Sequence, residues 1–204
     1  MQLECFVFGS FATNCYVASE GSEAWIIDPC CATSAEQTQL LRYIEQHQLQ
    51  VTALIATHGH FDHLWGAPWA CKQWNLPVLV HPADIPMAQA VQQQYELFGI
   101  PATATPFPVE DLLSSIKNLK SPMSDVQLLS TPGHTPGSVC LYWGKERILL
   151  SGDTLFCMGY GRTDLPGGNT GQLVESLERL FALPSDVQVF PGHGESTTIG
   201  DERR

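Results

Sequence analysis

The chain has 204 residues, 44% of them hydrophobic and 15% charged, which is enough for one substantial globular domain. Its 10 Lys and Arg residues against 21 Asp and Glu residues give a formal net charge of −11, which disfavours nucleic acid and anionic membrane surfaces as partners. No apolar run is long enough to span a bilayer, and the N-terminus lacks the basic start and apolar stretch of a secretory signal. Seven cysteines without a CxxC pair predict free thiols and a cytoplasmic location.

The first part of the chain reads as a meander of short strands followed by a helix. Apolar runs predict strands at residues 5–8, 15–18 and 24–27, and Asp28-Pro29 stops the third of them. A helix is expected from about residue 34, with Glu36 in its first turn and Leu40, Leu41 and Ile44 on its apolar face.

Farther along the chain, strands alternate with helices. Strands are predicted at residues 51–56, 77–80, 126–129, 138–143, 147–150 and 187–190. Helices are predicted at residues 62–74, 83–98 and 170–181, with an irregular loop at 101–108. Asn169 or Thr170 is expected to cap the last helix, and Trp65 and Trp69 to share one face of the first. This alternation favours sheets with helices packed outside them.

The segment after the predicted strand at 51–56 is dense in metal-binding side chains. Its sequence, THGHFDH, contains four of them, namely His58, His60, Asp62 and His63. Zinc binds imidazole nitrogen and carboxylate oxygen, and a catalytic zinc site needs several such ligands from different segments. Packing so many polar groups together has little structural benefit, so this cluster predicts a metal site.

Three later segments share one arrangement, in which an apolar strand and a glycine precede a metal-capable residue. These residues are His134, Asp153 and His193. The glycine lets the backbone turn sharply and approach a site closely. A single His after a strand is more often a hydrogen-bonded structural residue than a ligand. Beside the cluster at 57–63, however, these three residues are the expected completion of a site with room for two metals.

In this order the seven residues resemble the pattern of the metallo-β-lactamase superfamily, and the resemblance covers almost the whole chain. It implies an α/β fold, a four-layer αββα sandwich of two mixed sheets with helices outside, formed by residues 1–204 as a single domain. It also implies two zinc ions, with iron or a mixed iron–zinc pair as the alternative. The implied ligands are His58, His60 and His134 for the first metal, Asp62, His63 and His193 for the second, and Asp153 as a bridge.

Within this superfamily the chain is most similar to the glyoxalase II-like hydrolases. The further matching stretches are TNCY at 13–16, SGDTLF at 151–156, GRTD at 161–164, PGHG at 191–194 and TTIG at 197–200. Antibiotic-degrading members usually lack the bridging Asp, so Asp153 argues against a β-lactamase. Full-length glyoxalase II carries a C-terminal helical domain that helps to bind glutathione. This chain ends soon after His193, so we expect a short single-domain relative without that domain.

The resemblance implies a dinuclear metal hydrolase that cleaves a thioester such as S-lactoylglutathione, or a related acyl ester, with a metal-bound hydroxide. Metal binding lowers the pKa of water to about 7, so a nucleophile exists at neutral pH. Asp62 is expected to be catalytic, because it can both bind metal and orient the nucleophile. The expected partner is this small-molecule substrate, with no nucleic acid and no membrane, and the oligomeric state is not predicted.

Three other functions compete with this one. A sulfur dioxygenase acting on glutathione persulfide shares the GRTD stretch and would hold one iron through the positions of His58, His134 and Asp153. Nucleases that process RNA share the HxHxDH pattern, but the net charge of −11 disfavours them. A non-catalytic metal-binding module leaves unexplained why the candidates follow strand ends, where sites on such sheets usually lie.

Several residues near the expected site have two readings. Phe11, at the tip of the first hairpin, either walls an apolar substrate pocket or packs against the sheet. Arg162 either pairs with Asp164 and braces its loop or contacts a substrate carboxylate, and Tyr160 is a further candidate for substrate contact. Asp28 either orients a ligand imidazole or only shapes a turn.

Overall fold

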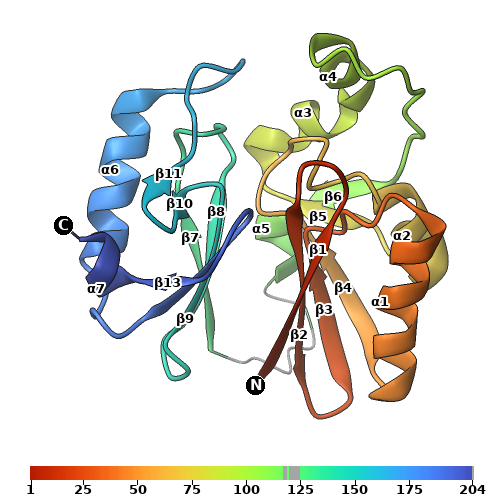
Figure 1. The fold of residues 1–204 in the computed structure, drawn as a ribbon, viewed down its shortest axis with the longest axis horizontal. Coiled ribbons are helices and arrows are strands. Elements are labelled where there is room, and N and C mark those ends of the chain that lie inside the picture. Colours follow the sequence, from red (N-terminus) through yellow and green to blue (C-terminus); the bar gives the residue numbers. More distant parts are fainter. Residues whose placement is uncertain (117–118, 120–124, 204) are drawn as a thin grey trace. The chain divides into compact units, whose positions relative to one another are not determined.

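The computed structural model of the chain describes residues 1–116, 119 and 125–203. Its contacts divide it into two compact units, Met1–Pro122 and Met123–Arg204. Each unit contains one mixed β-sheet with helices beside it (Figure 1). Among the described residues, no helix has the length and apolar character needed to cross a membrane. The single domain over residues 1–204 stays a prediction.

The sheet of the first unit has six strands in the order β1-β2-β3-β4-β5-β6. The first three strands are antiparallel neighbours, whereas β3 to β6 run parallel to one another. Each parallel step contains a helix in its connection, as parallel pairing requires. The strands are β1 (Gln2–Phe8), β2 (Thr13–Glu20), β3 (Glu23–Ile27), β4 (Gln50–Ile55), β5 (Val78–Val80) and β6 (Val109–Asp111).

The helices of the first unit are short, apart from α1. A capping box begins α1, because Thr33 accepts from the N–H of Glu36 and the Glu36 carboxylate accepts from the N–H of Thr33. The helices are α1 (Ser34–Gln46), α2 (Ala67–Trp74), the 3-10 helix η1 (Pro82–Asp84), α3 (Ile85–Gln89), α4 (Val91–Leu97) and α5 (Leu112–Ser115).

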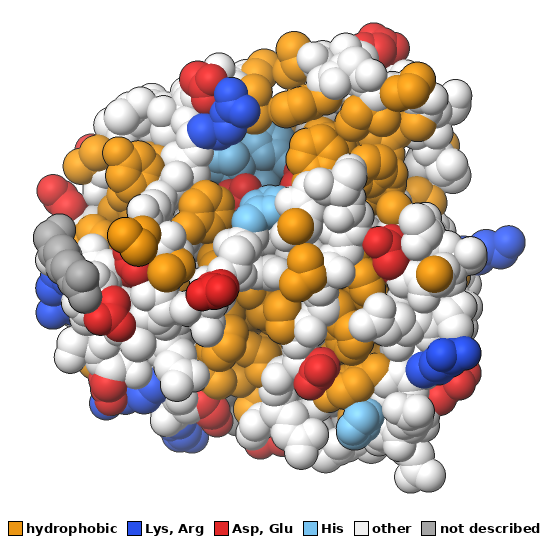
Figure 2. Space-filling model, in the orientation of Figure 1, with side chains coloured by type: hydrophobic (Ala, Val, Ile, Leu, Met, Phe, Trp, Pro, Cys, Tyr) orange, Lys and Arg blue, Asp and Glu red, His pale blue; other side chains and the backbone are white. Residues whose placement is uncertain are grey.

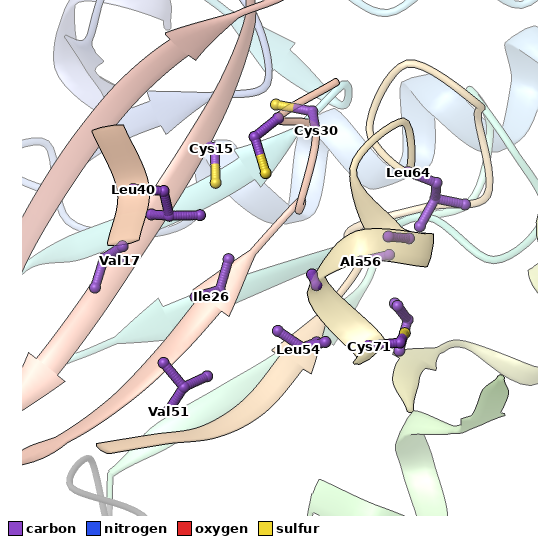
Figure 3. Packing of buried hydrophobic residues seen from close by; sticks show 14 of the residues in the cluster. Cys15, Val17, Ile26, Cys30, Leu40, Val51, Leu54, Ala56, Leu64 and Cys71 are labelled. Carbon is purple, nitrogen blue, oxygen red and sulfur yellow. The ribbon is translucent and has the colours of Figure 1, made fainter. Parts of the chain in front are cut away.

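The main core of the first unit lies between its sheet and the helices α1 and α2. Cys15 and Val17 of β2 and Ile26 of β3 are wholly buried, and the alternation of Cys15 and Val17 marks one face of a pleated sheet. Figure 3 shows these side chains together with Leu40 of α1 and Cys71 of α2. This packing fixes the carboxyl end of β4, where the loop with four ligand candidates begins.

The sheet of the second unit has five strands in the order β13-β12-β9-β8-β7, and β10 and β11 form a separate hairpin. The pair β9 and β12 is parallel and the other pairs are antiparallel. Helix α6 (Thr170–Phe181), capped by Asn169, the first of the two predicted caps, packs Leu173, Leu177 and Leu180 against this sheet. The other elements are β7 (Val126–Ser130), β8 (Val139–Trp143), β9 (Ile148–Gly152), β10 (Leu155–Phe156), β11 (Gly159–Tyr160), β12 (Gln188–Pro191), β13 (Thr197–Thr198) and α7 (Ile199–Glu202).

The helix predicted at residues 62–74 is shorter than expected, because α2 includes only its second part. The N–H of Gly66 donates to the carbonyl oxygen of Pro29 at 2.9 Å rather than within a helix, and Pro68 lies in the first turn of α2, where proline is favoured. Trp65 therefore precedes α2 and packs in a small aromatic cluster, while Trp69 packs against the main core. The prediction that Trp65 and Trp69 share a helical face is wrong.

The helix predicted at residues 83–98 is divided into η1, α3 and α4. Pro86 lies in the first turn of α3, where a backbone N–H is not needed and a new helix can begin. The sequence does not predict several elements of two to four residues, because segments so short carry little periodicity; these are β6, α5, β10, β11, β13 and α7. The other predicted strands and helices are confirmed, with β1 and β2 longer than expected.

Candidate metal centre

The four ligand candidates of the first unit lie on the loop that leaves β4. His58, His60 and His63 are buried, and the Asp62 side chain is 12% exposed. Nε2 of His58 lies 3.1 Å from Nδ1 of His60, and Nε2 of His63 lies 3.6 Å from Oδ2 of Asp62. The loop therefore presents two pairs of donor atoms that face each other.

Asp28, directly after β3, holds this loop. Its carboxylate accepts hydrogen bonds from the N–H of Thr57 at 2.7 Å, from the Thr57 hydroxyl at 2.9 Å and from Nδ1–H of His63 at 2.9 Å. The Asp28 side chain is only 1% exposed, and a buried carboxylate needs partners of this kind. Its φ of +54° also shapes a turn. Asp28 therefore both orients the imidazole of His63 and shapes a turn, and with the proton on Nδ1 the Nε2 atom of His63 is the one that can bind a metal.

Hydroxyl groups orient two further candidates. The Thr57 hydroxyl gives its proton to Asp28, so its oxygen accepts from Nδ1–H of His58 at 3.1 Å, and Nε2 is then the atom of His58 that can bind a metal. The Thr13 hydroxyl donates to Oδ2 of Asp62 at 3.1 Å. Thr13 begins the TNCY stretch, but its contact with Asp62 could not be read from the sequence, because 48 other residues separate them and only the folded sheet brings them together.

The three ligand candidates of the second unit follow three strands of its sheet. His134 follows β7, Asp153 follows β9 and His193 follows β12. These strands run in one direction, so their carboxyl ends share one edge of the sheet. Oδ2 of Asp153 lies 3.6 Å from Nε2 of His134 and 3.6 Å from Nε2 of His193. The structure thus brings these three residues together as the sequence predicts.

Backbone groups pack closely around two members of this second set, His134 and Asp153. Nδ1–H of His134 donates to the carbonyl oxygen of Arg162 at 2.7 Å, which leaves Nε2 for a metal. The chain passes close by at Gly161, where a Cβ would lie 1.9 Å from the carbonyl oxygen of Asp153 and 3.1 Å from the Cβ of His134. Only glycine allows this approach.

The spacing of the donor atoms suits a metal ion. Zinc binds nitrogen and oxygen at about 2.0–2.1 Å in a tetrahedral arrangement, which places neighbouring ligand atoms about 3.4 Å apart. The facing pairs within each unit are separated by 3.1 Å and 3.6 Å in the first and by 3.6 Å in the second. All seven side chains offer a nitrogen or oxygen atom that a metal can bind. Such donors fit zinc and also iron.

Phe11 packs against the ligand loop rather than lying alone at its hairpin tip. Its ring meets that of Phe61 at 5.2 Å between centroids, and also contacts Trp65 and Phe98. Phe11 remains 40% exposed. Figure 2 shows hydrophobic side chains gathered on the surface around α4, the helix that Phe98 follows. An apolar surface therefore adjoins the ligand loop within the first unit.

Arg162 and Asp164 brace the loop after β11. Nε and Nη2 of Arg162 donate to the two carboxylate oxygens of Asp164, each at 2.7 Å. These hydrogen bonds, with the positive charge, lower the pKa of Asp164 to about 2. Tyr160, on β11, is 66% exposed. All seven cysteines are free thiols, as predicted.

Comparisons with known proteins point to one family. The model of the Metallo-beta-lactamase superfamily matches residues 9–193. Hydroxyacylglutathione hydrolase GloC of Haemophilus influenzae is 30% identical over an alignment of 207 positions, which covers 100% of this chain and 96% of GloC. The structure of TTHA1623 in a di-iron-bound form is 34% identical, with a TM-score of 0.84 over 98% of this chain and 97% of that one. The BLEG-1 B3 metallo-beta-lactamase is 32% identical, with a TM-score of 0.81 over 98% of this chain and 96% of that one.

Proposed function

Because the chain belongs to the metallo-β-lactamase superfamily and has its α/β fold with two mixed sheets and helices, we propose that it is a metal-dependent hydrolase of a thioester or a related acyl ester. The similarity to GloC supports the glyoxalase II-like subgroup and a substrate like S-lactoylglutathione. The observation that carries the proposal is the spacing of the candidate atoms. In each unit, neighbouring candidates place their nitrogen and oxygen atoms as far apart as two ligands of one ion.

We infer that the two sets close around two ions. The proposed ligands are His58, His60 and His134 for the first ion, Asp62, His63 and His193 for the second, and Asp153 as the bridge. The hydrogen bonds at Nδ1 of His58, His63 and His134 support this assignment, because each leaves Nε2 for a metal. Zinc is the proposed metal, and the iron in TTHA1623 makes iron or a mixed pair the alternative.

The side chains of this chain supply orientation for the reaction. Bound ions of this kind lower the pKa of water to about 7 and polarise an acyl carbonyl. Asp62 is the proposed catalytic residue: the Thr13 hydroxyl fixes its Oδ2 atom, so its carboxylate can orient the attacking water. A thiolate is a good leaving group, so a thioester needs little help from a general acid.

Three residues are proposed to contact the substrate. The half-exposed ring of Phe11 suits an apolar part of the acyl group, and Tyr160 and Arg162 suit its polar parts. The role of Arg162 is tested by comparing the KM of Arg162→Ala with that of Asp164→Ala. Substrate contact raises KM only in the first variant, whereas pure bracing affects both variants alike.

The proposed partner is the small-molecule substrate alone, with neither nucleic acid nor membrane. The formal net charge of −11 supports this, because clustered Lys and Arg residues are what phosphate surfaces require. The seven free thiols support a reducing compartment such as the cytoplasm.

The proposed hydrolase is tested by measuring S-lactoylglutathione turnover together with metal content. We expect complete chelation to abolish turnover and added zinc to restore it. His58→Ala should also abolish turnover, while His47→Ala should not, because His47 lies at the exposed end of α1. Full turnover after complete chelation would refute the proposal.

A second candidate is the sulfur dioxygenase, with one iron held by His58, His134 and Asp153. The di-iron form of TTHA1623 supports iron as the metal of this candidate. Oxygen uptake by the iron-loaded protein with glutathione persulfide, without thioester turnover by the zinc form, would select this function instead.

A further inference from the structure

The first half of the ligand loop bonds to two side chains from the segment between β5 and β6. The N–H of Gly59 donates to Oδ2 of Asp84 at 2.9 Å. The N–H of Phe61 donates to Oε1 of Gln94 at 2.9 Å, and Nε2 of Gln94 donates to the carbonyl oxygen of Gly59 at 3.1 Å. Three backbone groups, on both sides of His60, are thus held by a carboxylate of η1 and an amide of α4.

The packing around these bonds is close. Asp84 is completely buried. A Cβ on Gly59 would lie 2.9 Å from the backbone oxygen of Asp84 and 3.0 Å from the Cβ of Met87. Nε2 of Gln94 also donates to the carbonyl oxygen of Met87 at 2.9 Å, so the same amide ties the loop to α3. The first half of the loop cannot move without breaking contacts with η1, α3 and α4.

The second half of the same loop has different supports. Asp28, after β3, accepts from His63, and Thr13, at the start of β2, donates to Asp62. Asp28 also accepts from Thr57, next to His58, so it holds both ends of the loop, whereas Asp84 and Gln94 hold Gly59 and Phe61 on either side of His60. Asp84 and Gln94 therefore act on the backbone between His58 and His60, whereas Asp28 and Thr13 contact the side chains of His63 and Asp62.

We propose that Asp84 and Gln94 are positioning residues that set the affinity of His58 and His60 for their metal ion. The inference rests on the proposed function, in which these two imidazoles share the first ion. Gly59 lies between them, and both its N–H and its carbonyl are held, so the imidazoles keep their directions before an ion arrives. An ion that binds a preformed site does not have to order the loop, and its affinity is higher for that reason.

The decisive variant is Gln94→Met, which keeps the length of the side chain and removes its three hydrogen bonds. Zinc affinities are measured by competition with a chromophoric chelator, without any substrate. We expect one zinc to bind about 10-fold more weakly and the other to change by less than about twofold. Gln92→Met is the matched control on the same helix, because Gln92 accepts from the N–H of Ala104 at 2.9 Å and also donates to Glu96. It should leave both affinities unchanged.

Two variants of Asp84 test the other contact. Asp84→Asn keeps an oxygen that can accept from the N–H of Gly59, so we expect zinc affinity to stay within about threefold of that of the natural protein. Asp84→Ala removes the acceptor, and we expect a loss of about 10-fold at the same zinc as Gln94→Met. Where Asp84→Ala fails to fold, Gln94→Met decides alone.

The affected ion is identified with ligand variants as references. Gln94→Met should weaken the zinc that is lost in His58→Ala, and it should increase hydrogen exchange at the amides of residues 59 and 61. Unchanged affinities, equal weakening of both ions, or weakening of the zinc lost in His63→Ala would overturn the inference. The two proposals can fail separately. If the variants show the expected zinc affinities but the natural protein hydrolyses no thioester, the proposed function is refuted and this inference stands.

Discussion

The two sets of ligand candidates are built in different ways. In the first unit, four candidates lie on one loop, and side chains from other segments orient them. In the second unit, three candidates follow three strands, and a backbone carbonyl orients one of them, His134. The side chain of His63 is 0% exposed, whereas that of His193 is 27% exposed. Candidates that are adjacent on one loop need side chains from other segments to orient them. Candidates that follow strands of one sheet are positioned by the strands themselves.

The largest effect on stability and activity is expected from crowding the backbone beside the candidates of the second unit. In Gly161→Ala the new Cβ would lie 1.9 Å from the carbonyl oxygen of Asp153, and neither this group nor the nearby Cβ of His134 is a flexible end. We expect the free energy of unfolding to fall by about 3 kcal/mol, and hydrolysis to be lost. Urea unfolding measures the first effect.

Gly159→Ala is the matched control, since a Cβ on Gly159 meets nothing within 4 Å. In the ligand loop of the first unit, Gly59→Ala should lower the free energy of unfolding by less, about 1 kcal/mol. The closest contacts of the new Cβ are the backbone oxygen of Asp84 at 2.9 Å and the Cβ of Met87 at 3.0 Å. Equal urea midpoints for the variants of Gly161 and Gly159 would show that close backbone packing does not hold the second set.

Removing a hydrogen bond that orients the ligand loop of the first unit should lower metal affinity more than it lowers stability. Asp28→Asn keeps a residue type that tolerates the φ of +54°, but it replaces one of two accepting oxygens with an NH₂ group. We expect zinc affinity and turnover to fall by about 10- to 100-fold. Asp111→Asn, at the cap of α5, is the control. Zinc binding as tight as in the natural protein would mean that Asp28 does not orient His63.

The same contrast explains how far the sequence predicts the site. The cluster from His58 to His63 is visible because its members are adjacent, whereas His134 and His193 become convincing only beside that cluster. The supports are not visible at all, because Gln94 reaches the loop through tertiary structure and no spacing rule connects them. The predicted helix at residues 62–74 starts late for a related reason: its apolar pattern includes Trp65, but the N–H of Gly66 bonds to Pro29, which is distant in the sequence.

The caps of the two long helices offer the smallest test of the comparison. In the first unit, the Glu36 carboxylate accepts from the N–H groups of Gly9 and Thr33, each at 2.8 Å. Burial alone would raise the pKa of Glu36, but these hydrogen bonds lower it below its ordinary value of 4.5. In the second unit the neutral Asn169 caps α6. Acid should therefore weaken the cap of α1 and spare that of α6.

The sign follows from the lowered pKa of Glu36. Its stabilising effect is complete above the ordinary value of 4.5 and is lost as pH falls through the lower value in the folded protein. Hydrogen exchange between pH 6 and pH 3, corrected for intrinsic rates, should show α1 losing protection before α6. Thr33→Ala should destabilise α1 by about 1 kcal/mol at pH 7, and Glu36→Gln should remove the pH dependence. If α1 and α6 lose protection together, the ionised carboxylate of Glu36 does not stabilise α1 in the first unit.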